Sequence, residues 1–331
     1  MTSKLLAAGV TLLSAGIASA ALGQTPVLTV LTYDSFTSEW GPGPAIELGF
    51  EAQCGCDVQF QTAGDGAALL ARLQLEGAAS TADVVVGLDT NLIEAARQTG
   101  LFAAINQGEN TVPNGFSDAN FLPFDWGWFA FVYDKTKLSN PPTSLAELAA
   151  SDLKILIQDP RSSTPGLGLV LWVKSVFGDK APQYWADLAD NIVTVTPGWS
   201  EAYGMFLEGQ ADMVLSYTTS PAYHLIAEGD DSKAAALFSD GHYMQIEVAG
   251  QLVASKQPEL AAAFLDYLQG DAAQTALITT NWMYPAKMPA AGLPQGFETL
   301  VQPDVSLRIG SDKIESLRQD AVDEWLTALS R

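Results

Sequence analysis

Residues 194–224 read TVTPGWSEAYGMFLEGQADMVLSYTTSPAYH, and this stretch predicts a strand, a helix and a second strand in succession. The Pro197-Gly198 pair breaks the first strand, Ser200 is placed to cap the helix, and Gly209 ends it. The run MVL at 213–215 is typical of a buried strand. The apolar residues of the helix share one face: Ala202, Tyr203, Phe206 and Leu207. Such a unit indicates an α/β fold.

Aromatic residues follow both strands of this unit. Trp199 comes after the first strand, and Tyr217 and Tyr223 come after the second. Ligands of open α/β sheets bind at the carboxyl ends of the strands, so these rings are candidates for a pocket that holds a flat or cationic small molecule. Ordinary half-buried aromatic residues would give the same pattern. This stretch alone leaves both interpretations open.

The first 20 residues have the pattern of a secretory signal. Lys4 supplies the positive charge, residues 5–17 are apolar but short for a membrane span, and Ala18-Ser19-Ala20 is a small-residue cleavage site. Cleavage after Gly23 is the alternative. No cysteine lies near the cut, so we expect no lipid anchor. No later segment is apolar enough to cross a bilayer, and we therefore expect a soluble, exported protein.

The formal net charge of the 331-residue chain is −22, and loss of Lys4 with the signal makes it one unit more negative. A nucleic-acid partner is disfavoured, because phosphate backbones require basic patches. A cationic ligand would be attracted by such a field. Most of the carboxylates are nevertheless typical of a surface that keeps a protein in solution.

The two cysteines, Cys54 and Cys56, are separated by one residue. In an oxidising compartment such a pair can form a tight disulfide, and the alternatives are a redox pair or metal ligands. Neither His224 nor His242 lies at ligand spacing from the cysteines, which disfavours a metal site. We expect a structural disulfide and no bound metal.

The order of the remaining segments predicts two lobes. Strands at 27–32, 57–61 and 83–87 alternate with helices that begin near Pro44, Ala67 and Leu92, and this βαβαβ order predicts a parallel sheet. A second set opens with the strand at 154–158. The aromatic strand at 123–134 and the strand at 245–254 are expected to cross between the lobes. We therefore predict a first lobe of residues 26–126 and 248–331 and a second lobe of residues 127–247.

The loop at 159–166, DPRSSTPG, is rich in hydroxyl groups and precedes a helix. The free N–H groups and the positive dipole end of a helix N-terminus can hold an anion. A Ser/Thr/Pro loop in this place more often only caps the helix. No Gly-Lys-Ser/Thr follows, so the loop is not a Walker nucleotide site.

Two αβ lobes behind a signal look like a substrate-binding protein of an ABC importer, and residues 254–274 resemble a turn-and-helix pattern of the type II group. Further blocks, in one order through nearly the whole mature chain, resemble the periplasmic thiamine-binding proteins of bacterial thiamine importers. These blocks are TYDSF (32–36), WGPGP (40–44), DVVVGLD (83–89), QDPRSSTPGLGL (158–169), GWSEAYG (198–204), LSYTTSPAYH (215–224) and NWMYP (281–285). The resemblance implies an α/β, two-lobed, type II periplasmic-binding-protein fold with the ligand cleft between the lobes.

The resemblance also implies ligand-binding residues. It puts four aromatic residues around the two rings of the ligand: Tyr33, Trp199, Tyr223 and Trp282. Asp65 matches the acidic position that meets the aminopyrimidine. Ser163 and Tyr217, with Thr164 beside them, match positions near the phosphate or hydroxyethyl end. Cys54 and Cys56 fit the paired cysteines of the family.

The implied function is capture of thiamine, thiamine monophosphate or thiamine diphosphate in the periplasm and delivery to a membrane permease driven by a separate ATPase. No cofactor, nucleic acid or catalysis is expected, and a monomer is usual in the family. One alternative is a thiaminase I-like enzyme, which needs a cysteine nucleophile. The other is a binding protein for a different cation, such as a polyamine or ferric iron. Iron is disfavoured by the absence of an adjacent tyrosine pair with a histidine nearby.

Overall fold

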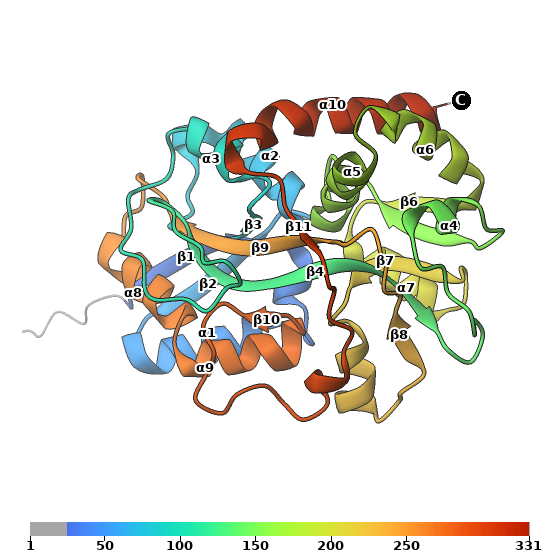
Figure 1. The fold of residues 1–331 in the computed structure, drawn as a ribbon. Helices are drawn as coiled ribbons and strands as arrows, with labels where there is room; N and C mark the ends of the chain where they lie inside the picture. The colour runs from blue at the N-terminus through green and yellow to red at the C-terminus, as the bar shows by residue number, and fades with distance from the viewer. Residues whose placement is uncertain (1–24, 331) are drawn as a thin grey trace, which may run out of the picture.

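The computed structural model describes residues 25–330, and the predicted signal at 1–20 lies outside the described residues. An 11-stranded sheet runs through the protein with the main order β2-β1-β3-β9-β4-β7-β5-β6, and helices cover both of its faces (Figure 1). Within the described part, no helix combines the length and the apolar character that a membrane crossing needs.

Parallel strands at each end of the sheet form the centres of two lobes. The first lobe contains β1 (Val27–Thr32), β2 (Asp57–Thr62) and β3 (Val84–Asp89), with α1 (Gly43–Cys54), α2 (Gly66–Glu76), α3 (Ile93–Gln98), α8 (Pro258–Leu268) and α9 (Asp271–Ala276). The second lobe contains β5 (Ile155–Gln158), β6 (Ile192–Thr196), β7 (Met213–Tyr217) and β8 (Lys233–Ala235), with α4 (Leu145–Ala149), α5 (Thr164–Phe177), α6 (Ala181–Leu188) and α7 (Trp199–Leu207). The predicted strands and helices are present, with ends that differ by a few residues.

Two long strands join the lobes. β4 (Leu122–Asp134) and β9 (His242–Gln251) pair with each other in antiparallel register, β9 also pairs with β3, and β4 also pairs with β7. A third connection was not predicted. The chain after α9 adds β10 (Tyr284–Pro285) to β4 and β11 (Ser306–Leu307) to β9 before it enters α10 (Ser311–Leu329).

The core follows from alternation along the strands. On β1, Leu28 and Val30 pack towards α1, α8 and α9, whereas Leu31 faces the opposite layer of helices. In that opposite layer, the fully buried Trp172 of α5 and Trp185 of α6 lie in one continuous cluster with residues of α10. The faces of the sheet are therefore covered by helices. The edge at the carboxyl ends of the parallel strands, where ligands of open α/β sheets bind, stays accessible.

The C-terminal helix differs from its predicted place. The predicted first lobe includes residues up to 331, but α10 packs mainly on α5 and α6 and crosses the upper side of the molecule (Figure 1). Lys174 of α5 forms an ion pair with Glu324 of α10 at 2.6 Å. The connection through β10 and β11 carries the chain across the lobes, which helical periodicity alone does not reveal.

Two local predictions are wrong. α7 begins at Trp199 with Gly198 at its N-cap and no side-chain cap, so Ser200 lies within the first turn. The segment NWMYP (281–285) has no helical or strand period, which predicts an aromatic turn, but Tyr284 and Pro285 pair with β4. The reason is tertiary, because the Tyr284 ring stacks on Trp126 at 4.7 Å and Trp126 Nε1 donates to the Pro285 carbonyl at 3.2 Å.

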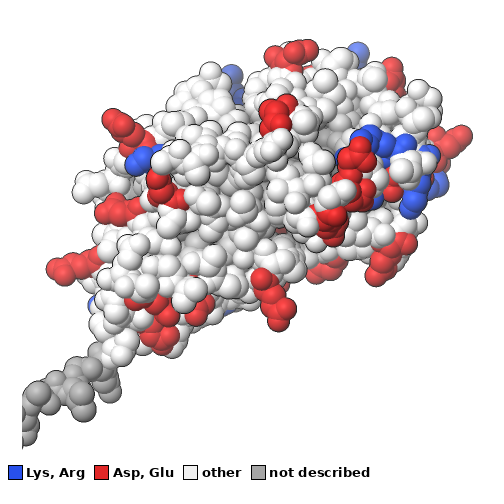
Figure 2. All heavy atoms as spheres, turned by 90° about the horizontal axis from the view of Figure 1, so that it is seen from below, with Lys and Arg blue, Asp and Glu red and all other residues white. Residues whose placement is uncertain are grey.

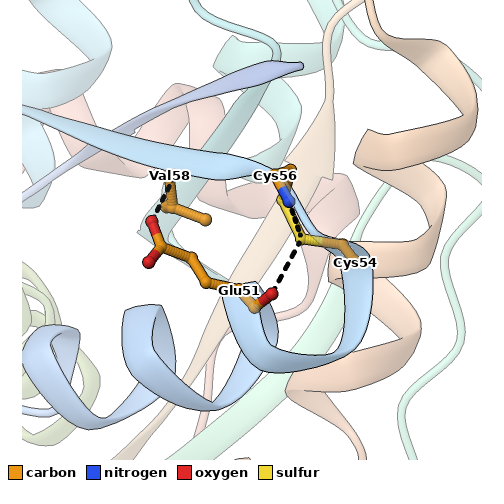
Figure 3. The surroundings of a disulfide bond; sticks show 4 residues. All are labelled: Glu51, Cys54, Cys56 and Val58. Atoms are coloured by element: carbon orange, nitrogen blue, oxygen red, sulfur yellow. Dashed lines mark hydrogen bonds between the residues drawn. A yellow bond between two sulfur atoms is a disulfide. The ribbon is translucent and has the colours of Figure 1, made fainter. Parts of the chain in front are cut away.

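The predicted disulfide between Cys54 and Cys56 is present (Figure 3). Cys54 ends α1, Cys56 precedes β2, and Gly55 between them has a φ of 62°, a left-handed conformation that favours glycine. Glu51 Oε1 accepts a hydrogen bond from Val58 N at 2.8 Å beside the bridge. The bridge lies at the amino end of β2, whereas ligand clefts in such folds lie at the carboxyl ends.

Candidate functional site

A cavity of about 470 Å³ lies between the two lobes. Six of the eight predicted ligand-binding residues line it: Tyr33, Asp65, Trp199, Tyr217, Tyr223 and Trp282. They come from the ends of β1 and β7, from the starts of α2 and α7, and from the segments that follow β7 and α9. Residues widely separated in sequence thus converge at the carboxyl ends of the strands, where ligands of open α/β folds bind.

Trp199 forms one aromatic wall with a fixed orientation. It is the first residue of α7, its ring stacks on Tyr203 at 4.9 Å, and its Nε1 donates to Ser216 Oγ at 2.8 Å. Trp40 from the first lobe lies 6.0 Å from the Trp199 ring, measured between centroids. The two indoles therefore meet across the cleft and leave aromatic faces for a ligand.

Tyr223 and Trp282 form another part of the wall, with ring centroids 5.7 Å apart. Tyr223 begins a short π-helix of residues 223–228, and Trp282 follows a second π-helical turn, Leu277–Asn281. Trp282 has a φ of 56°, unusual for a large side chain, and its N–H donates to the Leu277 carbonyl at 3.0 Å. Irregular helix ends and a left-handed residue are frequent at functional sites.

The cavity-lining residue Glu247 belongs to a row of three acidic residues. Asp89 of β3, Glu247 of β9 and Asp125 of β4 are paired in register across three neighbouring strands. Asp89 and Asp125 are fully buried, whereas Glu247 is 6% exposed and lines the cavity. Among residues 25–330, none of the three carboxyl groups forms an ion pair with Lys or Arg.

Neutral groups hold these carboxyl groups in place. Tyr33 OH donates to Glu247 Oε2 at 3.1 Å, and Gln245 Nε2 donates to Glu247 Oε1 at 3.2 Å. Asn281 Nδ2 donates to Asp125 Oδ2 at 2.6 Å, while Asp125 Oδ1 has no hydrogen-bond partner. The row is thus oriented by hydrogen bonds from neutral groups and not by basic partners.

Burial and mutual repulsion raise the pKa values of this row. Burial raises the pKa of Asp89 to about 7 and that of Asp125 to about 8. Burial, followed by the charges of Asp125 and Asp65, raises the pKa of Glu247 well above its usual range. Burial also raises the pKa of Tyr33 and Tyr217, with Glu247 as the next cause. A cation in the cavity would favour the ionised carboxylates.

Asp65 lies half-buried at the N-terminus of α2, where it accepts from Gly66 N at 2.9 Å. Ser163 and Thr164 do not line the cavity and are 0% and 2% exposed. Ser163 Oγ instead donates to Asp65 Oδ2 at 2.8 Å. Burial raises the pKa of Asp65, and hydrogen bonds from Ser163, Gly66 and Thr164 act in the opposite direction.

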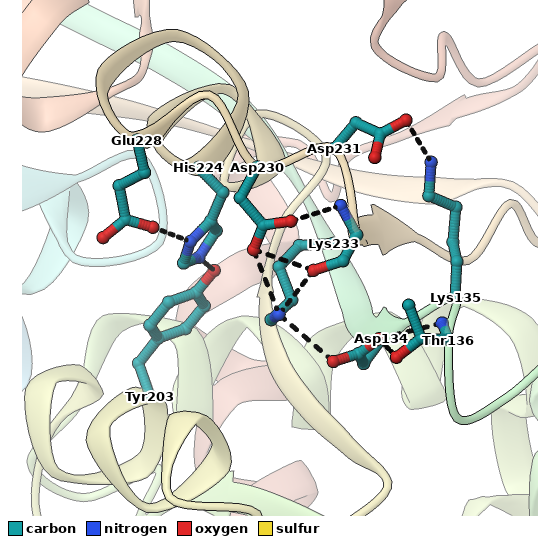
Figure 4. Close-up of polar contacts among 10 residues, drawn as sticks. Asp134, Lys135, Thr136, Tyr203, His224, Glu228, Asp230, Asp231 and Lys233 are labelled. Carbon is teal, nitrogen blue, oxygen red and sulfur yellow. Dashed lines mark hydrogen bonds and ion pairs between the residues drawn. The ribbon is translucent and has the colours of Figure 1, made fainter.

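A polar cluster supports the Tyr203 wall from behind (Figure 4). Tyr203 OH lies 3.0 Å from His224 Nε2, and His224 Nδ1 lies 2.7 Å from Glu228 Oε2. His224, Glu228 and Asp230 have ligand atoms within 4.8 Å of one another, a grouping compatible with a metal ion. However, Lys233 already lies between Asp230 and Asp134, so the protein itself provides a cation there.

Acidic side chains are scattered over the surface. Figure 2 shows Asp and Glu spread over one face, with Lys and Arg gathered mainly towards one end. None of the described residues that line the cavity is Lys or Arg. The cavity is therefore an acidic and aromatic site, which suits a flat cation rather than an anion.

Known proteins resemble this chain over most of its length. The bacterial extracellular solute-binding protein family matches residues 33–275. The thiamine-binding periplasmic protein of Salmonella typhimurium is 56% identical over 310 residues, 92% of this chain and 94% of that protein. The chain belongs to the family of periplasmic thiamine-binding proteins. This membership confirms the predicted family and the predicted periplasmic location.

Solved structures agree with this family. A periplasmic thiamin binding protein has a TM-score of 0.90 at 53% identity, covering 93% of this chain and 97% of that one. Iron-bound HitA from Pseudomonas aeruginosa has a TM-score of 0.71 at 19% identity, covering 89% of this chain and 99% of that one, and this likeness concerns the fold alone. The predicted α/β, two-lobed type II fold is confirmed.

Several cavity residues of this family member were not predicted. Trp40 and Asn281 lie within the blocks WGPGP and NWMYP, and Tyr203 was interpreted only as part of an apolar helix face. Glu247 is the most informative omission. A glutamate inside the buried strand segment QIEVAG (245–250) is a signal that could have identified it. Burial of an ionisable side chain is costly, so its presence in a strand buried on both faces indicates a functional role.

Proposed function

We propose that this chain binds thiamine in the cleft between its lobes and delivers it to the permease of an ABC transporter, whose separate ATPase supplies the energy. Family membership supports the ligand class, since the relative named above is a thiamine-binding periplasmic protein. The observation that carries the proposal is the row of Asp89, Glu247 and Asp125, which are buried and paired in register, next to an aromatic cavity. Among the described residues that line this cavity, none is Lys or Arg.

The chemistry of thiamine fits this arrangement. Its thiazolium ring carries a fixed positive charge, which aromatic faces attract by about 0.5–2 kcal/mol per contact. The aminopyrimidine is flat and can stack, and its amino group can donate to a carboxylate such as Asp65. Glu247 adds a negative charge at the floor of the cavity, where low polarity strengthens the attraction.

We extend the proposal to thiamine monophosphate and thiamine diphosphate. Because no described Lys or Arg lines the cavity, the phosphate would depend on hydroxyl or backbone N–H donors or on solvent. The lining hydroxyl groups include those of Ser35, Ser200 and Ser220. The phosphate end is therefore expected to contribute less to affinity than the two rings.

We also propose that the protein binds its ligand without catalysing a reaction and that it acts as a monomer. A thiaminase I-like reaction requires a cysteine nucleophile, and both cysteines of the sequence are joined in the bridge away from the cleft. Closure of the lobes along β4 and β9 around a ligand would give the permease a distinct form to recognise.

The test begins with the small molecule that co-purifies with the exported protein, identified by mass. Thiamine or one of its phosphates is expected, and stripped protein should bind thiamine with displacement by neither spermidine nor ferric iron at equal concentration. Spermidine displacing thiamine would favour the polyamine alternative. Incubation with thiamine and a nucleophile should give no turnover above background, and measurable turnover would contradict a purely binding role.

A further inference from the structure

Two helix N-termini face each other across the cleft. Asp65 immediately precedes α2 of the first lobe, and Ser163 immediately precedes α5 of the second lobe. The helices have 11 and 14 residues, and α2 packs against α5. Each N-terminus presents N–H groups and a positive dipole end that favour a carboxylate.

One carboxylate serves both helices. Asp65 caps its own helix through Gly66 N at 2.9 Å and accepts from Ser163 Oγ of the other lobe at 2.8 Å. Ser163 makes no side-chain cap with its own helix, although serine is a favoured capping residue. The backbone and the side chain of Thr164 also lower the pKa of Asp65. The anion at the start of α5 is therefore supplied by the protein itself.

The surrounding backbone is fitted to this contact. Ala68 N of α2 donates to the Ser162 carbonyl at 3.0 Å, a main-chain hydrogen bond between the lobes. A Cβ atom added at Gly66 would collide with Thr164 Oγ1. Gly66 thus allows an approach of the two N-termini that a larger residue would block.

We propose that Asp65, Ser163, Thr164 and Gly66 form a latch between the lobes, in which the start of α5 holds Asp65 at the cavity wall. Ser163 and Thr164 are then positioning residues rather than contacts of a phosphate group. The latch concerns closure of the lobes, and its role in affinity rests on the proposed function. Since a carboxylate has about four acceptor positions, Asp65 keeps acceptors for a ligand while it is latched.

The latch explains two observations together. Ser163 and Thr164 are almost fully buried, which leaves no surface for a phosphate, while Ser163 Oγ donates to Asp65. When the lobes close, the Asp65 carboxylate loses contact with solvent and gains these hydrogen-bond partners. When the lobes open, it loses the partners again. Closure of the lobes and fixing of Asp65 are therefore coupled. Loss of a hydrogen bond to a charged group should weaken binding roughly tenfold.

The test compares wild type with Ser163→Ala and Gly66→Ala, and uses Ser175→Ala as the control. Ser175 lies on α5 but its Oγ donates within that helix, to the Leu171 carbonyl at 2.8 Å. Small-angle scattering of ligand-free protein should give a larger radius of gyration for both latch variants and an unchanged value for the control. Calorimetry should show a roughly tenfold loss for thiamine and an equal loss for thiamine monophosphate in Ser163→Ala.

Two results would overturn the latch. An unchanged radius of gyration in both latch variants would show that these residues do not hold the lobes together. A loss restricted to thiamine monophosphate would assign Ser163 to the phosphate instead. If wild-type protein does not bind thiamine at all, the proposed function fails, and the scattering of the ligand-free variants still decides the latch.

Discussion

Glu247 faces the cavity from a strand that joins the lobes, and the hydroxyl of Tyr33 and the amide of Gln245 hold its two oxygens. An acidic residue in such a strand is expensive to bury, and the neighbouring Asp125 increases that cost. A bound cation would relieve both effects. We therefore propose that Glu247, which periodicity treats as part of the core, recognises the charge of the ligand.

The first prediction concerns this charge. Glu247→Gln keeps the size and shape of the side chain, removes its negative charge and replaces one of its two acceptor oxygens with an amide donor. We expect the affinity for thiamine to fall roughly tenfold or more, because the attraction acts in a site of low polarity. Calorimetric titration measures the change, and the exposed Glu259→Gln serves as a matched control. Equal affinities for wild type and Glu247→Gln would exclude Glu247 as the counter-charge.

Trp199 provides the second prediction. Trp199→Ala should weaken thiamine binding by about 1 kcal/mol or more, because stacking and the attraction between cation and ring are both lost. Trp199→Phe keeps an aromatic face and should retain more of the affinity. The Trp199 indole would not belong to the site if calorimetry gave the same dissociation constant for all three proteins.

The third prediction concerns pH. The pKa of Asp89 rises from an ordinary value of 3.8 to about 7 in the folded protein, so its contribution to stability is complete below pH 4 and is lost as pH rises through 7. The raised pKa of Asp125 and of Glu247 acts in the same sense. The melting temperature of ligand-free protein should therefore fall between pH 5 and pH 8, and Asp89→Asn should flatten this slope.

Ligand binding should have the opposite pH dependence. Protonated carboxyl groups attract a cation less, so thiamine affinity should increase from pH 5 to pH 8 and binding should release protons. Titrations in two buffers of different ionisation enthalpy measure this release. A pH-independent affinity together with a flat melting profile would show that the acidic row does not titrate in this range.

At the scale of elements, α10 shows how the lobes share their support. It begins after β11, which pairs with β9 in parallel register, and it packs on α5 and α6 with Trp325 buried at 4% exposure. None of its described residues lines the cavity. The C-terminal helix therefore stabilises the layer of helices that carries the N-terminus of α5.

The fourth prediction tests this role. Trp325→Ala should lower the free energy of unfolding by about 3–5 kcal/mol, because a large buried ring leaves a cavity in the core. Thiamine affinity at 25 °C should stay within about twofold of wild type, since the substitution does not touch the cleft. Denaturant unfolding and calorimetry measure the two quantities. A loss of less than about 1 kcal/mol would show that α10 is not integral to this core.

Much of this element structure was predictable, and the exceptions have physical causes. The strands and the long helices follow from periodicity, as in β1 and α2, where local apolar spacing determines the buried face. β10 was missed because its pairing depends on Trp126, about 160 residues away. Ser163 was expected to face a ligand, yet its partner Asp65 lies on the other lobe, and only tertiary structure brings them together.

For the site, the sequence predicted the aromatic residues but not the buried glutamate. The aromatic positions Tyr33, Trp199, Tyr223 and Trp282 converge on one cavity, and resemblance to a family was needed to select them among many other aromatic residues. Glu247 escaped because neither a motif nor a helical period marks it. Its significance follows from the register of β3, β9 and β4, which places three carboxyl groups side by side.

At the scale of the whole molecule, two sealed lobes enclose a cleft that Glu247 and Asp65 line with carboxyl groups and whose walls are aromatic. β4, β9 and the segment through β10 and β11 connect the lobes and provide the axis about which they can close. The dispersed negative surface adds a general attraction for cations that salt weakens. The proposed selectivity therefore depends on the cleft and not on the overall charge.

The most direct measurement is a calorimetric comparison of thiamine with an analogue in which an uncharged ring replaces the thiazolium. Thiamine should bind one-to-one and at least roughly tenfold more tightly than the uncharged analogue, and Glu247→Gln should remove most of that difference. Equal affinity for the two ligands, or no binding of thiamine, would contradict recognition of a permanent cation by an acidic and aromatic cleft.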